Sequence, residues 1–438
     1  MLFAQQQSTD SLPQLEPIRL FLCGDVMTGR GIDQVLPHSG DSTLHEPFVR
    51  DARRYVELAE RVSGAIPRRA KFDYIWGDAQ AELDRAAVDL RIINLESSIT
   101  SSNDYWRDKR IHYRMHPRNI DCITAARIDC CCLANNHILD WGYAGLAETL
   151  RTLDAAGIAH PGAGRNAAEA AAPAVFDVPG KGRVMVFWYG SPTSGVPWEW
   201  AATADRPGVN FLEDISKEAA RNIASEMRSF SRDRDVIVAS IHWGENWGHQ
   251  LSDEETLFAR QLIEEGIAVV HGHSSHHVKA AEIHHCRLIL YGCGDFLNDY
   301  EGISGYESFR SDLTLIYLAA IDPRQGQLLE ARLVPMRVHR FRLNRASGVE
   351  ARWLSDLLNR LGAPLGTQAE MAPDHTITLH AHQTANREQR TGQAIASPSL
   401  GGRPAPSAPP GRGITQRHAE VRTQRSQAPR DACSREAT

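Results

Sequence analysis

The sequence predicts an α/β fold with a largely parallel centre that ends in antiparallel strands. Short apolar runs alternate with amphipathic segments of helical period, which is typical of parallel strands joined by helices. Later apolar runs follow one another without a long helix between them, as antiparallel strands do. The 438 residues, 42% hydrophobic and 23% charged, are ordinary for a soluble globular protein with a sizeable core.

The individual elements follow from these periods. The expected strands span residues 18–23, 90–94, 129–133, 184–189, 236–241, 267–271, 287–290, 313–319 and 327–334. The expected helices span residues 78–87, 117–127, 143–157, 214–230 and 253–265. Gly157 and Gly266 stand where helices commonly end on a glycine.

Both ends of the chain differ from this pattern. Residues 1–16 are expected to form a flexible N-terminus, and residues 382–438 a disordered tail, because the tail has too few apolar side chains to offset its ordering entropy. One folded domain, 17–381, remains. No apolar run has the length of a signal-peptide core or a membrane span, which favours a cytoplasmic location and leaves association with the cell envelope open.

Charge and cysteine usage narrow the function classes. The net charge of −6 argues against a nucleic-acid partner, which usually requires a basic surplus. The eight cysteines lie mostly in apolar, strand-like runs without a CxxC pair or regular spacing. We expect them to be buried small hydrophobes, which favours a reducing compartment.

Polar side chains gather just after the expected strands, where open α/β sheets collect reactive groups. Asp25, in "GDVMTGRG", could be an oxygen ligand for a divalent ion or could cap the next helix. Arg30, in the same turn, could contact an anionic substrate. Glu96, in "NLESSIT", could reach a metal or substrate, or could be an ordinary surface carboxylate.

The densest polar cluster is "LANNHILDWG", which follows a buried strand. Asn136 offers an amide oxygen to a metal ion. His137 is the candidate general acid or base. Asp140 could orient that imidazole or could cap the following helix.

Histidines cluster after two later strands. His242 and Glu245 lie in "IHWGENW", where a satisfied core histidine is the alternative reading. The run "HGHSSHH" supplies four further histidines as candidates for metal or phosphate contact, namely His271, His273, His276 and His277. Asp295 and Asn298, in "GCGDFLND", could support these ligands or contact the substrate.

Two further segments hold candidate substrate contacts. Trp198 and Trp200 lie in a long loop rich in Gly, Pro and Ser, which could be a lid or a simple packed loop. Arg114 belongs to the alternating run "RIHYRMHP", which could face an anionic group or solvent. Taken together, the strand-exit clusters indicate a divalent-metal site, suited to two ions roughly 3.5–4 Å apart, with Mn, Fe and Zn not distinguished.

The motifs resemble a known family. The segments "GDVMTGRG", "NLESSIT", "LANNHILDWGYAGL", "IHWGEN", "GHSSHH" and "YGCGDFLND", in this order, resemble the capsule-synthesis CapA family of poly-γ-glutamate biosynthesis proteins over residues 18–379. That family is similar to calcineurin-type metallophosphoesterases. The resemblance therefore implies a four-layer αββα sandwich with a dinuclear metal site.

The resemblance also implies roles for individual residues. His137 would protonate the leaving group, and the metal ligands would be Asp25, Glu96, Asn136, His242 and His273, completed by His276 or His271. Three positions depart from the phosphoesterase pattern. Met27 replaces the histidine of the DxH motif, Glu96 replaces a bridging Asp, and "GHSSH" is one residue longer than GHxH.

Two functions stay open at this point. The first is a metal-dependent hydrolase or transferase that acts on an anionic polymer or a small anionic precursor. The second is a non-catalytic accessory component that binds the polymer, for example within a membrane-bound synthase or export complex. Met27 favours the second function, because a missing ligand weakens a metal site.

Overall fold

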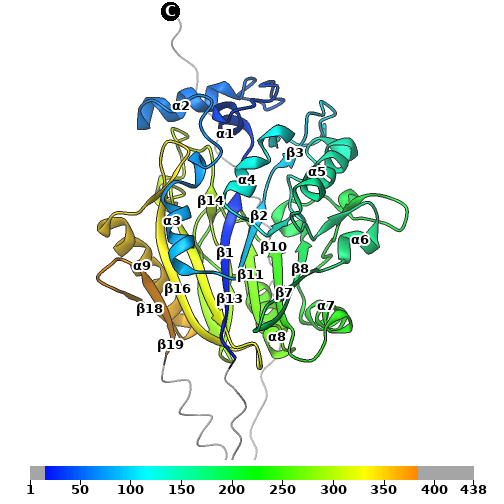
Figure 1. Ribbon diagram of the computed structural model, residues 1–438, viewed down its shortest axis with the longest axis vertical. Coiled ribbons are helices and arrows are strands. Elements are labelled where there is room, and N and C mark those ends of the chain that lie inside the picture. The colour runs from blue at the N-terminus through cyan, green and yellow to red at the C-terminus, as the bar shows by residue number, and fades with distance from the viewer. Residues whose placement is uncertain (1–14, 383–438) are drawn as a thin grey trace, which may run out of the picture. The chain divides into compact units, whose positions relative to one another are not determined.

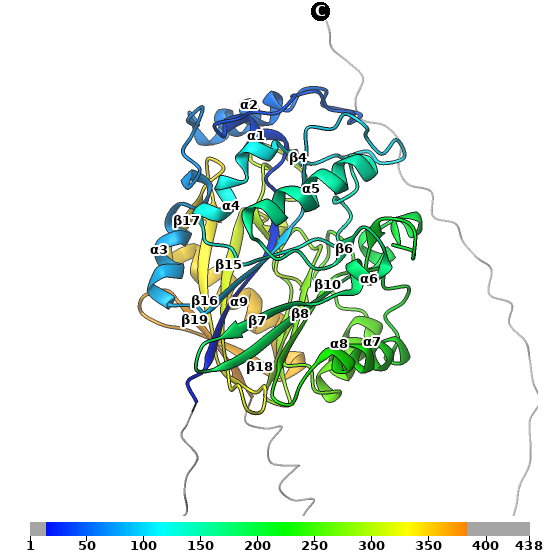
Figure 2. The ribbon, with the colours of Figure 1, turned by 45° about the vertical axis from the view of Figure 1, so that its right-hand side comes forward.

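The computed structural model describes residues 15–382. The expected disordered tail, apart from its first residue, and nearly all of the expected flexible N-terminus lie outside these residues, as does Cys433. Figures 1 and 2 show the described part from two directions.

The larger sheet is built around β1 (Ile18–Val26), the central strand in Figure 1. Two strands pair with β1 in parallel, β2 (Leu90–Leu95) and β14 (Asp295–Leu297). A third, β5 (Cys130–Cys132), pairs in parallel with β2. The antiparallel part contains β15 (Leu313–Ile321), β16 (Leu328–Val338), β17 (Leu343–Arg345), β18 (Thr367–Met371) and β19 (Ile377–Ala381). The predicted parallel centre with antiparallel strands after it is confirmed.

The smaller sheet has a parallel centre and antiparallel edges. Its order is β12 (Ala281–His284), β13 (Arg287–Leu290), β11 (Val269–His273), β10 (Val236–His242), β8 (Gly182–Gly190) and β7 (Ala174–Val178). Two short ladders lie outside the main sheets, β3 (Ser98–Ile99) with β4 (Arg114–Met115), and β6 (Ala163–Gly164) with β9 (Gly208–Val209).

Side-chain alternation along the smaller sheet explains the layers. Val186 and Val238 face the core that this sheet shares with the larger sheet. Phe187 and Ile237, one position away, face the second core instead, as the two-residue period of a strand requires. That second core is covered by α7 (Lys217–Phe230) and α8 (Asp253–Glu264), which lie outside the smaller sheet in Figure 2.

Helices also cover the larger sheet. Leu83 of α3 (Gly77–Ala86), Ile123 of α4 (Asp121–Ala125) and Leu146 of α5 (Gly142–Ala156) join the first core. The remaining helices are α1 (Arg30–Val35), α2 (Arg53–Ser63), α6 (Ala167–Ala171) and α9 (Gly348–Gly362). The order helix, sheet, sheet, helix is the four-layer αββα sandwich that the resemblance implies.

Several predicted bounds are wrong in instructive ways. The first strand extends to Val26, so Asp25 lies on the strand rather than after it. The helix expected at 117–127 is split into a 3₁₀ turn, η2 (Pro117–Asn119), and α4, and it ends before Arg127, whose φ of 52° is left-handed. The predicted burial of the cysteines is confirmed for six of them and is wrong for Cys286, which is exposed.

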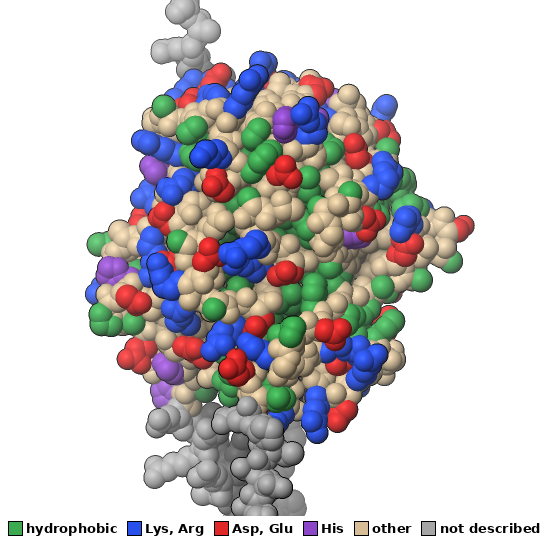
Figure 3. Space-filling model, viewed as in Figure 1, with side chains coloured by type: hydrophobic (Ala, Val, Ile, Leu, Met, Phe, Trp, Pro, Cys, Tyr) green, Lys and Arg blue, Asp and Glu red, His purple; other side chains and the backbone are tan. Residues whose placement is uncertain are grey.

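The described surface carries mixed charge. Lys and Arg side chains are interspersed with Asp and Glu on the face that Figure 3 shows. Among residues 15–382, no helix combines the length and the apolar character that crossing a bilayer requires.

Candidate metal centre

The site lies where the two sheets end side by side. Strand register places Asp25 of β1 opposite Asn94 of β2 and opposite Asp295 of β14. The close approach of β14 depends on Gly24, because a Cβ there would lie 1.6 Å from the carbonyl oxygen of Gly294. A glycine beside Asp25 therefore lets three polar strand ends share one buried space.

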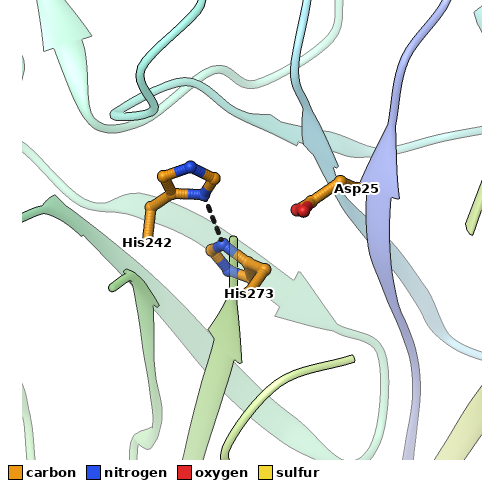
Figure 4. Close-up of side chains that lie close together, drawn as sticks. All are labelled: Asp25, His242 and His273. Carbon is orange, nitrogen blue, oxygen red and sulfur yellow. Dashed lines mark hydrogen bonds between the residues drawn. The ribbon is translucent and has the colours of Figure 1, made fainter. Parts of the chain in front are cut away.

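The first ligand cluster joins both sheets. Asp25 meets His242 of β10 and His273 of β11, and the ligand atoms of all three lie within 4.8 Å of one another. Figure 4 shows the Asp25 carboxylate pointing toward the two rings, whose Nδ1 atoms are 3.2 Å apart. Asn94 donates to Asp25 Oδ1 at 2.7 Å, and this hydrogen bond orients the carboxylate.

A second cluster shares Asp25 and lies on the side of β14. It adds His276 and Asp295, again with ligand atoms within 4.8 Å of one another. His276 Nδ1 lies 2.8 Å from Asp295 Oδ1, while Asn298 donates to the other Asp295 oxygen at 2.9 Å. Both clusters are buried.

An acid–base group stands beside these clusters. His137 Nδ1 lies 2.6 Å from Asp140 Oδ2, and its Nε2 lies 3.7 Å from Glu96 Oε1. Lys109 Nζ is 2.6 Å from the other Asp140 oxygen. Asp140 therefore orients the imidazole, and it does not cap α5, which begins at Gly142 without a side-chain cap.

Asn136 also reaches the centre. Its Oδ1 lies 3.2 Å from His242 Nε2. Glu96 Oε1 is 3.9 Å from the same nitrogen. The structure therefore brings together Asp25, Glu96, Asn136, His137, Asp140, His242, His273, His276, Asp295 and Asn298.

Burial sets the protonation of this centre. It lowers the pKa of His137 to about 4 and holds the pKa values of His242 and His273 well below the usual range. Imidazoles with such pKa values are neutral at pH 7, which is the form that binds metal. Burial, together with Asp295, raises the pKa of Asp25 to about 7, and burial beside Asp25 raises the pKa of Glu96 strongly.

These residues fit a divalent cation. Glu96 Oε2 is buried and has no hydrogen-bond partner among the described residues. Asp25, Glu96 and Asp295 are each at most 1% exposed, and burying several carboxylates together is unfavourable unless a cation or protons offset their charge. Neutral imidazole nitrogens and carboxylate oxygens are the donors that Zn, Fe and Mn take.

A cavity of about 900 Å³ opens onto this centre. The buried side chains of His137 and His276 line it, together with the half-buried Asn136. Further out, its walls carry several cationic side chains, Arg30, Lys109, Arg110, Arg310 and Arg337, with acidic ones between them. The exposed side chains of Phe48 and Tyr306 also line it.

The structure does not bring His271 to the ligand clusters. Its Nδ1 lies 2.8 Å from Ser240 Oγ and its Nε2 lies 2.7 Å from the Cys23 carbonyl oxygen. Both ring nitrogens are thus engaged by the protein, and the residue ties β11 to β1. A structural role suits His271 better than the predicted role as ligand.

Two predicted substrate contacts are buried elsewhere. Arg114 stacks on Trp141, with its guanidinium 3.8 Å from the ring centroid, and donates to the Ser102 carbonyl. Trp200 is fully buried and lies edge-on to Trp106. The strand that was predicted around Arg114, facing solvent or an anionic group, is only the two-residue β4, and both of its residues are buried.

The other predicted substrate contacts differ in exposure. Trp198 is 58% exposed and packs against Phe211. Glu245 is exposed in the turn after β10. Arg30 lines the cavity, but it is 4% exposed and is paired with Glu46 and Asp299. Contact of these three residues with a substrate stays a prediction.

Two further side chains contact the centre, and neither contact was expected from the sequence. Lys109 sits in the polar run "NDYWRDKR", which has the composition of a solvated loop. Trp188 stacks on His273, with ring centroids 4.2 Å apart. The sequence carried no signal for either contact, because both depend on segments far apart in the chain.

Comparison with known proteins agrees with the motifs. A family model described as "Bacterial capsule synthesis protein PGA_cap" matches residues 19–300. The chain is 44% identical to a "Probable polyglutamine synthesis accessory protein" of Mycobacterium tuberculosis, over 83% of this chain and 96% of that one. It is 23% identical to the "PGA biosynthesis protein CapA" of Bacillus subtilis, over 63% and 62%.

Among solved structures, the protein TT1561 of Thermus thermophilus is similar over 72% of this chain and 97% of that one, with 9% identity and a TM-score of 0.32. That likeness is too weak to say anything of function. The family match and the mycobacterial relative confirm the resemblance that the motifs carry. The chain belongs to the bacterial capsule synthesis protein family PGA_cap.

Proposed function

We propose that the protein is a metal-dependent hydrolase or transferase that acts on an anionic polymer, or on its precursor, during capsule or poly-γ-glutamate synthesis. One observation carries the proposal. The buried ligand cluster of Asp25, His242 and His273 lies beside an oriented His137–Asp140 pair, and His137 lines an open cavity. Ligands, a proton carrier and a route for substrate are therefore adjacent.

The relatives supply the biological setting. The Bacillus protein is named for poly-γ-glutamate (PGA) biosynthesis and the mycobacterial protein for polyglutamine synthesis. A poly-γ-glutamate chain carries one free carboxylate per residue. Cationic side chains along the cavity, such as Arg110 and Arg310, suit a substrate of that charge.

His137 is the proton carrier in this proposal. Asp140 accepts from its Nδ1, which leaves Nε2 as the nitrogen with a free lone pair. Because the pKa of His137 is about 4, Nε2 is unprotonated at neutral pH. It first accepts a proton from the attacking group and then returns it to the leaving group.

The neighbouring side chains hold this arrangement. Lys109 pairs with Asp140, and the pKa of Asp140 lies below its usual value because His137 and Lys109 outweigh its burial. Asp140 therefore remains an acceptor for the imidazole. Asp25, His242 and His273 would hold a divalent ion, which would supply Lewis-acid polarisation of the bond under attack.

An accessory, non-catalytic role is the second candidate. Met27 occupies the position of a phosphoesterase metal ligand, and the mycobacterial relative is named an accessory protein. In this alternative the cavity binds the polymer within a synthase or export complex without turning it over. Co-purification with a membrane synthase, in the absence of any hydrolysis, supports that role over the first.

The test combines metal analysis with a substrate screen. Protein purified without chelator is analysed for Mn, Fe and Zn, and is then assayed against phosphoesters and γ-glutamyl polymers with each metal added. His273→Ala should bind less metal than wild type, and His137→Ala should keep the wild-type metal content but lose turnover. His277→Ala is the matched control, because His277 lies outside both ligand clusters.

The outcomes separate the candidates. Stoichiometric metal with turnover that depends on His137 supports the enzyme. Stoichiometric metal and polymer binding without turnover supports the accessory role. Absence of stoichiometric metal from both wild type and His273→Ala sinks the proposal of a metal-dependent reaction.

A further inference from the structure

Met27, two residues after the first ligand Asp25, does not replace the missing phosphoesterase histidine. Met27 is buried, and its thioether accepts a long hydrogen bond of 3.8 Å from the Tyr300 hydroxyl. A thioether is a soft donor that suits Cu(I) rather than the harder ions Mn²⁺, Fe²⁺ or Mg²⁺. A second ion would therefore need ligands from elsewhere in the fold.

Strand β14 brings such a ligand to the same place. It runs parallel to β1 and sets Asp295 directly opposite Asp25. Asp295 is 1% exposed, and Asn298 holds one of its oxygens at 2.9 Å. The other oxygen, Oδ1, faces His276.

The longer histidine motif explains why His276 faces this position. Ser274 has a φ of 99°, a left-handed conformation that is rare for a residue with a side chain. Ser275 then turns away, and its hydroxyl donates to the His277 carbonyl. The extra residue in "GHSSH" thus moves the ligand role from position 275 to His276, which reaches Asp295.

We propose that Asp25, His276 and Asp295 form a second metal position that replaces the one lost with the histidine at position 27. The inference rests on the proposed metal dependence and extends it. Glu96 supports it independently, because its buried Oε2 lacks a partner among the described residues and the carboxylate lies within interaction range of both Asp25 and Asp295. Asp25 is shared by the two positions.

The spacing of the donors fits an ion. Two neighbouring ligands of an octahedral ion, each about 2.0–2.1 Å from it, lie about 2.8–3.0 Å apart. His276 Nδ1 and Asp295 Oδ1 are 2.8 Å apart. A direct hydrogen bond between them has the same length, so only metal binding distinguishes the two arrangements.

The two positions differ in ligand chemistry. The first has two imidazoles and one carboxylate, whereas the second has one imidazole and two carboxylates. Nitrogen-rich sites favour Zn and Fe, and oxygen-rich sites favour Mn and Mg. We therefore expect the second position to take Mn²⁺ or Mg²⁺ more readily than the first.

The experiment counts ions rather than turnover. Chelator-stripped full-length protein is loaded with Mn²⁺, passed through gel filtration and analysed for bound Mn. Wild type should retain two ions per chain, whereas Asp295→Asn, His276→Gln and His273→Gln should each retain one. The matched controls, Asp312→Asn and His277→Gln, should retain two, because neither residue belongs to a ligand cluster.

A spectroscopic readout keeps the test decisive if a variant folds poorly. Two Mn²⁺ ions that share Asp25 lie roughly 3.5–4 Å apart and couple magnetically. Wild type should show the coupled Mn²⁺ EPR signal, which should become that of isolated Mn²⁺ in Asp295→Asn.

The outcomes separate this inference from the proposed function. If wild type holds one ion that His273→Gln removes and Asp295→Asn retains, the second position does not exist and metal dependence stands. Loss of all metal in Asp295→Asn overturns a separate second position, because Asp295 then supports the whole centre. Absence of metal in wild type overturns both proposals.

Discussion

Replacing Arg30 with Met tests whether a buried ion-pair network holds the strand ends that carry the site. The guanidinium is sandwiched between Tyr55 and Tyr113, 3.8 and 4.5 Å from their ring centroids. It pairs with Glu46 at 3.1 Å and makes two hydrogen bonds to Asp299. Methionine fills much of the same volume but leaves both carboxylates buried without their cation.

The expected loss follows from that burial. The side chains of Arg30, Glu46 and Asp299 are at most 3% exposed. Removing one partner from a buried pair typically destabilises a protein by about 3–5 kcal/mol. With an unfolding entropy of about 0.8 kcal/mol/K for roughly 370 ordered residues, the melting temperature should fall by about 4–6 °C.

The assay is thermal unfolding with a double-mutant cycle. Arg30→Met/Asp299→Asn should be less destabilised than the sum of the two single variants, because the second change removes an unpaired charge. Arg54→Met is the matched control, since its pair with Glu57 is exposed, and its melting temperature should match wild type. An Arg30→Met variant that melts within about 1 °C of wild type, with additive changes in the double variant, refutes the reasoning.

Three other predictions concern the site and its frame. His137→Ala should lower kcat at least about 100-fold without changing metal content, which steady-state kinetics and metal analysis measure together. Mn²⁺ at about 100 times its Kd should stabilise chelator-stripped protein by about 2.7 kcal/mol in a thermal-shift assay, a gain that His273→Gln should reduce. Gly24→Ala should lose soluble yield or melt well below wild type, because its Cβ would overlap the Gly294 carbonyl, whereas Gly40→Ala, whose Cβ would come no closer than 3.1 Å to the Asp33 side chain, should change less.

The parallel core was predictable because it depends on local patterns. Apolar runs such as 184–189 and 236–241 are β8 and β10 to within two residues. Their side chains are apolar on both faces, as expected for a strand covered on one side by a sheet and on the other by helices. Parallel strands end at the same edge of their sheet. An apolar run in the sequence therefore also predicts that the polar residue after it lies at that edge.

The choice among the clustered histidines was not predictable. His271 and His276 are both close to the end of β11, and the sequence around them does not rank them. Their surroundings differ, because the Cys23 carbonyl accepts from the His271 ring, while Asp295 faces the His276 ring. Both partners come from the other sheet, so only the packing of the two sheets decides which imidazole is available.

Some local signals were readable but were not used. Ser347 is the N-cap of helix α9 in a capping box, in which the Glu350 carboxylate accepts a hydrogen bond from the Ser347 backbone N–H. This pattern precedes an amphipathic run, and it predicts the helix that the sequence reasoning left out. Lys109 is different in kind, because its role depends on a loop folding back over Asp140.

The division of ligands between the sheets connects fold and chemistry. The larger sheet supplies the oxygen donors at the centre, Asp25 and Asp295, from parallel strand ends. The smaller sheet supplies His242 and His273. Neither sheet alone offers a mixed nitrogen and oxygen set, so the geometry of the site depends on how the sheets face each other. His271 holds that relation by bridging β11 to β1, which gives a fully buried histidine a structural reason to lie beside the candidate ligands.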